Sequence, residues 1–240
     1  MQFSVASIVL EASSQANDQG AVPYARWKQS EIVQYLDDAL IQVGTFRPDA
    51  FAATITVALQ AGSQQTLPPG FSFLKSVDAN ATNSNCPDAT IVECDLNMLR
   101  AFFKKPCTPT GGAGDYRVRS FAYDGRNPNV FYVSPPVPVA SAGLSVTLTA
   151  VGEAPQYAVS DIGAGTLVAI DPKYRNALLA WMLYRAYEVD TESVSSRQTK
   201  LDNEGLFWKT LGVNYKQESL YRSGWYLGDR GLKDNQPGRH

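Results

Sequence analysis

The chain has 240 residues, of which 44% are hydrophobic and 18% charged, and its net charge at pH 7 is −2. Such a composition can bury a sizeable core, which excludes wholesale disorder, and no apolar run approaches the roughly 20 residues that span a bilayer. The small acidic excess argues against a dedicated nucleic-acid-binding protein, which needs a clear excess of cations. The first residues lack a basic segment and Glu11 interrupts the apolar stretch after them, so we do not expect a secretory signal.

The N-terminal part of the chain predicts two helices. Residues 3–17 carry helical periodicity, and residues 28–43 form the clearest amphipathic pattern, which Pro48 ends. Lys28 cannot accept the free amide hydrogens at a helix start, so we expect Ser30 to cap the second helix and begin it later. The apolar positions of this helix recur every three or four residues, at Ile32, Leu36, Ala39, Leu40 and Val43.

The middle of the chain switches to a period of two. Residues 54–59 alternate between polar and apolar, and residues 71–74 resume the extended pattern after a proline-glycine turn. Residues 78–90 are typical of a loop, and Asp95 is placed to cap a short helix that continues to Phe103.

A second group of strands is predicted between residues 115 and 151. Residues 116–123 and 130–133 alternate on either side of a turn, and Pro135-Pro136 should end the second strand, because proline cannot donate to a sheet ladder. Residues 144–150 predict one more strand. These strands favour a small antiparallel sandwich or partial barrel.

Helix returns at Asp171-Pro172, where an N-cap residue precedes a proline at the first helical position. Residues 174–189 are apolar nearly all round, so we expect this helix to be buried on most sides. The last helix carries Val194, Leu201 and Phe207 and ends at Gly212. No periodicity continues afterwards, which predicts an extended arm over residues 213–240. The arm holds five Lys/Arg and three Asp/Glu, a net charge of +2, against −4 for residues 1–212.

The order of elements predicts an α+β fold. We expect a helical bundle formed by residues 1–50 and 170–212, an inserted antiparallel β-rich domain over residues 51–169, and the extended C-terminal arm over residues 213–240.

The sequence offers little support for catalysis. The only histidine is His240, which leaves no imidazole base in the folded body and no histidine-rich metal site. Asp37 and Asp38 are adjacent on the predicted helix, so their carboxylates diverge by about 100° and are expected on a solvated face. Two glycine clusters, at residues 111–114 and 163–165, lack nucleotide-binding fingerprints and are expected to be turns.

The cysteines predict no disulfide framework and no metal site. They lack C-x-x-C spacing and are expected to be reduced thiols, with a bridge between any two of them left open. The three are Cys86, Cys94 and Cys107.

An ordered set of motifs covers residues 26–212 and resembles the head-to-tail adaptor (connector) proteins of bacteriophages, in particular the tail tubular protein A of short-tailed phages. The motifs are Arg26-Trp27, the helical residues 31–39, Arg47-Pro48-Asp49-Ala50, Gln65-Thr66-Leu67-Pro68, Tyr123-Asp124-(x)3-Pro128-(x)2-Phe131-(x)3-Pro135-Pro136, Asp171-(x)2-Tyr174-(x)2-Ala177-Leu178, Leu183-Tyr184-Arg185-Ala186-Tyr187 with Asp190, and Phe207-(x)3-Leu211-Gly212.

The resemblance implies a non-enzymatic subunit of the virion, without cofactor or metal and assembled in the host cytoplasm. It implies a homo-oligomeric ring, commonly twelvefold, that lies between the portal protein and the tail tube or nozzle protein. DNA would pass through the lumen of this ring without sequence-specific binding, to which a mildly acidic body is suited.

The arm is the expected interface with the portal or with a neighbouring subunit. Its aromatic side chains are unfavourable to leave in water and are common interface anchors. The candidate interface residues are Tyr215, Tyr221, Arg222, Trp225, Tyr226 and Arg230.

Two alternative functions and two interpretations of single motifs remain. The β-rich middle and the scattered Trp and Tyr residues leave open a carbohydrate-binding or polysaccharide-degrading tail module, and a chaperone near the portal that leaves before maturation is a further alternative. Arg47 is expected to be a helix-end cation favoured by the helix dipole. Arg26-Trp27 is expected to combine core packing with a solvated guanidinium.

Overall fold

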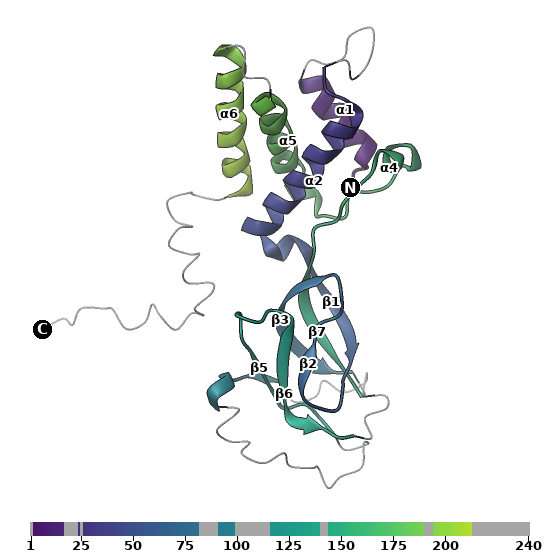
Figure 1. Ribbon diagram of the computed structural model, residues 1–240, viewed down its shortest axis with the longest axis vertical. Coiled ribbons are helices and arrows are strands. Elements are labelled where there is room, and N and C mark those ends of the chain that lie inside the picture. The colour runs from purple at the N-terminus through teal and green to yellow at the C-terminus, as the bar shows by residue number, and fades with distance from the viewer. Residues whose placement is uncertain are drawn as a thin grey trace, which may run out of the picture. The chain divides into compact units, whose positions relative to one another are not determined.

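The computed structural model describes residues 2–16, 24, 26–81, 91–98, 116–139, 144–189 and 194–212. The chain divides into two compact units, which we call the helical unit (residues 1–50 and 154–240) and the β unit (residues 51–153) (Figure 1). The α+β class is confirmed, whereas a bundle with an inserted sandwich stays a prediction. The β-rich domain was expected to extend to residue 169, but residues 154–169 lie in the helical unit.

Two helices open the helical unit. Helix α1 (Val5–Gln15) begins after Ser4, whose side chain accepts the Ser7 amide. Helix α2 (Gln29–Phe46) begins directly after Lys28, so the expected later start at Ser30 is wrong. The reason is Glu31, whose carboxylate accepts the Lys28 amide at 2.9 Å and stabilises the helix start without an acceptor side chain at the cap.

The second part of the helical unit begins with a short helix, α4 (Val159–Ala164), which ends at Gly165 in the left-handed region. The turn expected at residues 163–165 is therefore found only at Gly165, because Gly163 and Ala164 belong to the helix. The following chain runs beside the start of α1: Val5 donates to the Thr166 carbonyl at 2.9 Å, and Val168 donates to the Phe3 carbonyl at 3.0 Å. These bonds explain why residues 154–169 belong to the helical unit.

Helix α5 (Arg175–Val189) is the centre of the helical unit and packs against α1, α2 and α6 (Val194–Leu211). Its predicted burial on most sides is confirmed. The predicted Asp171 cap is also confirmed, since its side chain accepts the Lys173 amide in a 3₁₀ turn, η3 (Pro172–Tyr174). The buried residues of α5 are Ala177, Leu178, Leu179, Ala180, Met182, Leu183 and Ala186.

The β unit follows a short 3₁₀ turn, η1 (Pro48–Phe51), and holds two sheets. One has the strand order β1-β7-β3, and the other has the order β2-β6-β5-β4. Its core is centred on the fully buried Phe131, Val133, Val146, Leu148 and Ala150. The strands are β1 (Ala52–Ala58), β2 (Gly62–Thr66), β3 (Phe71–Asn80), β4 (Val92–Glu93), β5 (Ser120–Tyr123), β6 (Val130–Val137) and β7 (Ser145–Gly152).

Strand β3 runs to Asn80, so the loop expected from residue 78 begins later. The buried Asn80 amide mimics a strand partner: its nitrogen donates to the Val118 carbonyl at 3.0 Å, and its oxygen accepts the Val118 amide at 2.8 Å. This pairing holds residues 116–119 in place without strand structure, and β5 therefore begins only at Ser120.

Strand β6 continues through Pro135 and Pro136, which were expected to end it. Gly62 pairs with Val137, whereas Gln64 pairs with Tyr132, so the ladder between β2 and β6 is interrupted where the prolines lie. A proline without an amide hydrogen is tolerated at such an irregularity.

Two predicted features of the β unit lie partly outside the described residues. Asp95 accepts the Asn97 amide at 2.7 Å, as expected for a helix start, but residues 99–103 of the predicted short helix are not described. The glycine cluster at residues 111–114 also lies outside them.

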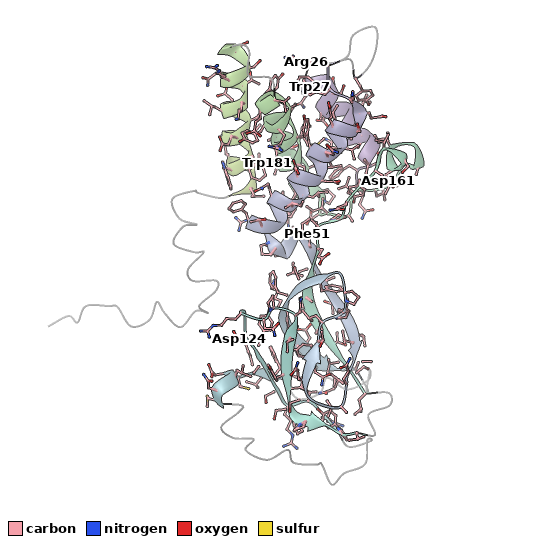
Figure 2. The ribbon with its side chains drawn as sticks, viewed as in Figure 1. Arg26, Trp27, Phe51, Asp124, Asp161 and Trp181 are labelled. Carbon is pink, nitrogen blue, oxygen red and sulfur yellow. The ribbon has the colours of Figure 1, made fainter. Side chains whose placement is uncertain are left out.

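Trp181 of α5 packs its ring against Phe207 (centroids 4.7 Å apart) and Tyr184 (4.8 Å). Its Nε1 is shielded from solvent and has no hydrogen-bond partner in the described part of the chain. Figure 2 shows this side chain within the helical unit. We predict that Trp181→Ala lowers the free energy of unfolding by about 3 kcal/mol, because it leaves a cavity beside Phe207.

Trp181→Phe is the matched variant. It keeps a ring against Phe207 and removes the unpartnered indole N–H, so we expect it to cost at most about 1 kcal/mol. Urea denaturation of both variants measures the difference. Equal losses for Ala and Phe would contradict this account of the site.

Candidate functional site

Among the described residues, no group of three or more His, Cys, Asp or Glu side chains is placed to hold a metal ion. The Sγ atom of Cys94 donates to the Phe121 carbonyl at 3.4 Å. Cys86, Cys107 and His240 lie outside the described residues. No helix in the described ranges has both the length and the apolar character needed to cross a membrane.

Asp37 and Asp38 diverge as predicted and both stay partly exposed, but each also contacts another segment of the helical unit. Asp37 accepts the Tyr157 amide at 2.9 Å and so attaches the chain before α4 to α2. Burial of this carboxylate raises its pKa, although the bond from Tyr157 partly offsets the effect. Asp38 contacts Arg185 of α5 instead.

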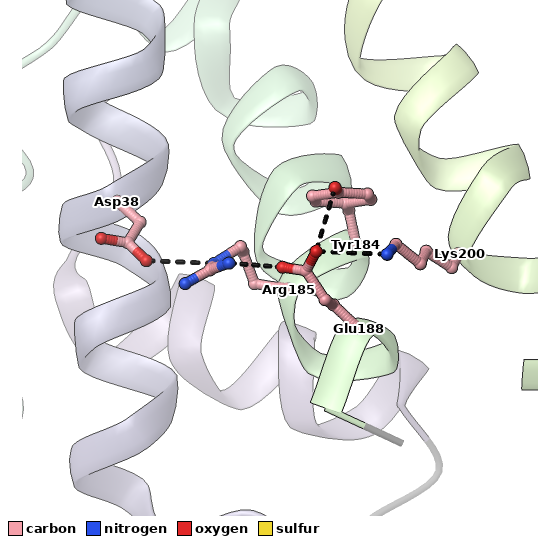
Figure 3. Close-up of polar contacts among 5 residues, drawn as sticks. All are labelled: Asp38, Tyr184, Arg185, Glu188 and Lys200. Atoms are coloured by element: carbon pink, nitrogen blue, oxygen red, sulfur yellow. Dashed lines mark hydrogen bonds and ion pairs between the residues drawn. The ribbon is translucent and has the colours of Figure 1, made fainter. Parts of the chain in front are cut away.

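A chain of charged side chains connects three helices of the helical unit (Figure 3). Asp38 of α2 accepts from Arg185 Nε at 3.1 Å, Arg185 also pairs with Glu188 one turn further along α5, and Glu188 accepts from Lys200 of α6 at 3.1 Å. The Tyr184 hydroxyl donates to Glu188 at 3.3 Å, and the Lys200 ammonium lies 5.1 Å from the centre of the Tyr184 ring. We call these five residues the interhelical network.

The network favours the ionised state of Glu188 and of Lys200. Burial raises the pKa of Glu188, but hydrogen bonds and charge from Lys200 and Arg185 outweigh it, so the net pKa is lowered. The hydrogen bond to Glu188 raises the pKa of Lys200. All of these side chains are partly exposed, and such a pair contributes only about 0.2–1 kcal/mol. The network therefore fixes how α2, α5 and α6 are aligned more than it stabilises the unit.

The C-terminal end of α6 is held by the end of α2. Arg47 Nε and Nη2 donate to the Leu211 carbonyl at 3.2 and 3.1 Å, and Nη2 also donates to the Gly212 carbonyl at 3.1 Å. Gly212 has a φ of +70°, as expected for the predicted glycine stop. Arg47 was expected to interact favourably with the dipole of its own helix, α2. Instead its guanidinium donates to the last carbonyls of α6, because this planar group can reach two acceptors at once.

Aromatic rings complete the contact between these helix ends. Phe46 and Trp208 have ring centroids 4.6 Å apart, and Phe207 beside them is fully buried. Leu201, expected in the helix pattern of α6, is 59% exposed, because α6 packs along α5 on one side only. These contacts hold the end of α6 at Gly212, and residues 213–240 follow directly after it.

Some of the residues singled out in the sequence are described by the structure, and others lie outside the described residues. Trp27 is buried, with its ring centroid 6.0 Å from that of Tyr187, and the Arg26 guanidinium lies 4.5 Å from the centre of the Trp27 ring, so the expected core packing is confirmed (Figure 2). The six candidate interface residues of the arm all lie outside the described residues.

Sequence reasoning missed the partner of Arg47 and the interhelical network. A usable signal exists for the latter: Arg185 and Glu188 are opposite charges three positions apart on an otherwise apolar helix, which indicates partners on neighbouring helices. For Arg47 the sequence gives only a helix-terminal arginine before Pro48, and its partner is more than 160 residues away.

We predict that Glu188→Gln lowers the free energy of unfolding at pH 7 by about 0.5–1 kcal/mol, because one carboxylate serves Arg185, Lys200 and Tyr184 together. The folded pKa of Glu188 is lowered, so its contribution is fully present above the unfolded value of about 4.3 and is lost as the pH falls through the folded value. Chemical denaturation at pH 7 and at a pH of about 3.5, below that unfolded value, should show a difference between the wild type and the Glu188→Gln variant mainly at the higher pH.

Asp202→Asn is the matched control, since it neutralises an exposed carboxylate of α6 that accepts a hydrogen bond from Gln198 one turn away. We expect it to leave the free energy of unfolding at pH 7 within about 0.5 kcal/mol of the wild type. A loss equal to that of Glu188→Gln would show a general charge effect.

A comparison with protein-family models matches residues 3–213 to the family described as SU10 adaptor protein. A search of curated proteins gives no match. The family match covers the helical unit up to Gly212 and the whole β unit, and it confirms the resemblance to phage head-to-tail adaptors. The narrower likeness to tail tubular protein A stays a prediction. Since the matched range spans nearly all of the chain, this protein belongs to the SU10 adaptor protein family and is a structural adaptor of a bacteriophage virion.

Proposed function

We propose that this adaptor is a non-enzymatic ring subunit that joins the portal protein to the tail tube or nozzle protein and surrounds the channel through which DNA leaves the head. The observation that carries the proposal is the family match together with the fixed origin of the C-terminal arm at Arg47. The ring is twelvefold in this proposal, with each subunit making the same head-to-tail contact until the ring closes.

The distribution of charge supports a channel that DNA can slide through. Residues 1–50 and 154–212 of the helical unit contain nine Lys/Arg and thirteen Asp/Glu, a net charge of −4, whereas the β unit contains seven of each. An acidic surface repels phosphate and lowers the affinity for DNA. In this proposal the helical unit, and not the β unit, supplies the acidic character of the ring.

The arm is the proposed docking element. Residues 213–240 carry a net charge of +2 and the candidate contacts Tyr215, Tyr221, Arg222, Trp225, Tyr226 and Arg230. Their acceptor is an acidic face, either on the portal or on the helical unit of a neighbouring subunit, and the attraction should weaken with salt. Because Arg47 and Trp208 fix the end of α6, each arm in a ring would start from an equivalent point.

A carbohydrate-binding module gains no support from the described residues. Such a module presents aromatic rings on an exposed sheet face, but Trp27, Trp181 and Trp208 all belong to the helical unit and make ring contacts there.

We predict that purified virions contain the protein in a fixed ratio to the portal, about one copy per portal subunit. Quantitative mass spectrometry of virions measures this ratio, and imaging of tails locates the ring. Absence from mature virions would favour a chaperone, and turnover of polysaccharide by the purified protein would favour an enzyme.

We predict that a chain ending at Val213 stays folded but no longer joins portal-containing heads. The α6 end is held by contacts within residues 46–212, so the truncation leaves those contacts intact. Circular dichroism monitors folding, and co-sedimentation with heads at low and high salt monitors docking. A full-length chain with Tyr221→Ala and Trp225→Ala removes two candidate contacts without shortening the chain, and it should also dock weakly. Unfolding of the truncated chain would show that the arm belongs to the core.

A further inference from the structure

Strand β1 has an outer edge that no strand pairs with in the described part of the chain, because it borders the sheet β1-β7-β3 (Figure 1). The Leu59 amide donates to the directly opposite Leu144 carbonyl at 3.0 Å. In an antiparallel pair, alternate residues turn both backbone groups toward the same neighbour. Residues 53, 55 and 57 therefore bond to β7, and Thr54, Thr56 and Ala58 turn their amides and carbonyls outward.

The other three sheet edges carry features that discourage pairing with another chain. Strand β3 shifts register three times against β7 and exposes Lys75 and Asp78. Strand β2 is interrupted by a register shift, and β4 has only two residues. Strand β1 pairs with β7 over seven residues without a shift and contains no charge and no proline. Long, regular, uncharged edges are the ones that pair with further strands.

The chain segments that supply β1 and its partner β7 carry no charge of their own. Residues 50–74 contain no Asp, Glu, Lys or Arg, and neither do residues 127–152. These two segments supply β1, β2, β6 and β7, so all fourteen charges of the β unit lie on the remaining segments. These segments can be buried without desolvating a charge of their own, as at the centres of protein interfaces, and Asp78 of β3 already accepts from the Thr149 hydroxyl of β7.

We propose that the outer edge of β1 pairs with an uncharged extended segment of a second copy of this chain and so forms part of the contact between subunits. This inference rests on the proposed ring and names a surface for its self-association. Charge selects the occupant: the C-terminal arm carries eight charged side chains and suits an acidic face, whereas the charge-free segments of a neighbouring β unit match β1. Backbone hydrogen bonds would supply affinity, and the outward-facing Thr54 and Thr56 would be enclosed at the contact.

The test removes one outward amide without touching the ladder to β7. Thr56→Pro eliminates the outward N–H, which an edge strand tolerates, and Thr56→Lys keeps the N–H but adds a charge at the edge. Thr56→Val is the matched control, because it changes the side chain and keeps the amide. Sedimentation velocity of the full-length proteins over a concentration series measures self-association, and thermal denaturation verifies folding.

We expect wild type and Thr56→Val to self-associate alike, and the Pro and Lys variants to associate at least about tenfold more weakly. Hydrogen exchange of the associated wild type should show new protection at the amides of residues 54, 56 and 58. Unchanged association of folded Thr56→Lys overturns the inference, as does a wild type that stays monomeric up to its solubility limit. A third outcome also overturns the inference: the wild type stays monomeric, and Thr56→Lys fails to join heads. In that case the outer edge of β1 binds a head or tail protein.

The outcomes separate this inference from the proposed function. If self-association depends on Thr56 but the protein is absent from virions, the β1 contact is supported and the adaptor ring is contradicted. A stoichiometric ring that forms equally well with Thr56→Lys contradicts only the β1 contact.

Discussion

Helix α5 sets the arrangement of the helical unit because it is apolar on nearly every side. A helix of this kind cannot be stable at a surface, so other helices must cover it, and α1, α2 and α6 do so. Helix α6 depends on this most, since its own apolar pattern is weak and its packing runs along α5. The fully buried Phe207 and Leu178 show how closely the two helices meet.

Polar contacts then select one arrangement from the many that apolar packing permits. The interhelical network fixes α2 against α5 through Asp38 and Arg185, and α5 against α6 through Glu188 and Lys200. Asp37 and its bond to Tyr157 place the segment before α4. In the β unit, the Asn80 amide performs the same task by pairing with the backbone of Val118. The Asp38–Arg185, Asp37–Tyr157 and Asn80–Val118 contacts join parts of the chain that are distant in sequence, as expected where packing alone leaves freedom.

Much of the fold could be predicted from the sequence, because local patterns determine it. The periodicity of α2, the apolar circumference of α5 and the left-handed glycine at residue 212 follow from rules that act within a few residues. The course of β6 through Pro135 could not be predicted, since it depends on an interruption in the ladder with β2. The partner of Arg47 was equally hidden, because nothing near residue 47 indicates the carbonyl of residue 211. The candidate site therefore emerged from the fold, and the arm residues proposed as an interface stay a prediction.

The hydrogen bonds between Arg47 and the end of α6 also determine how tension would be transmitted through the helical unit. A pull on residues beyond Gly212 would meet three hydrogen bonds to one guanidinium and the Phe46–Trp208 ring contact before it could peel α6 from α5. These contacts would share the load and pass it to the end of α2, where Arg47 lies only four residues before the β unit begins at Phe51. A load on the C-terminal segment would therefore act first on the end of α2, before it reached the packing of α6 along α5.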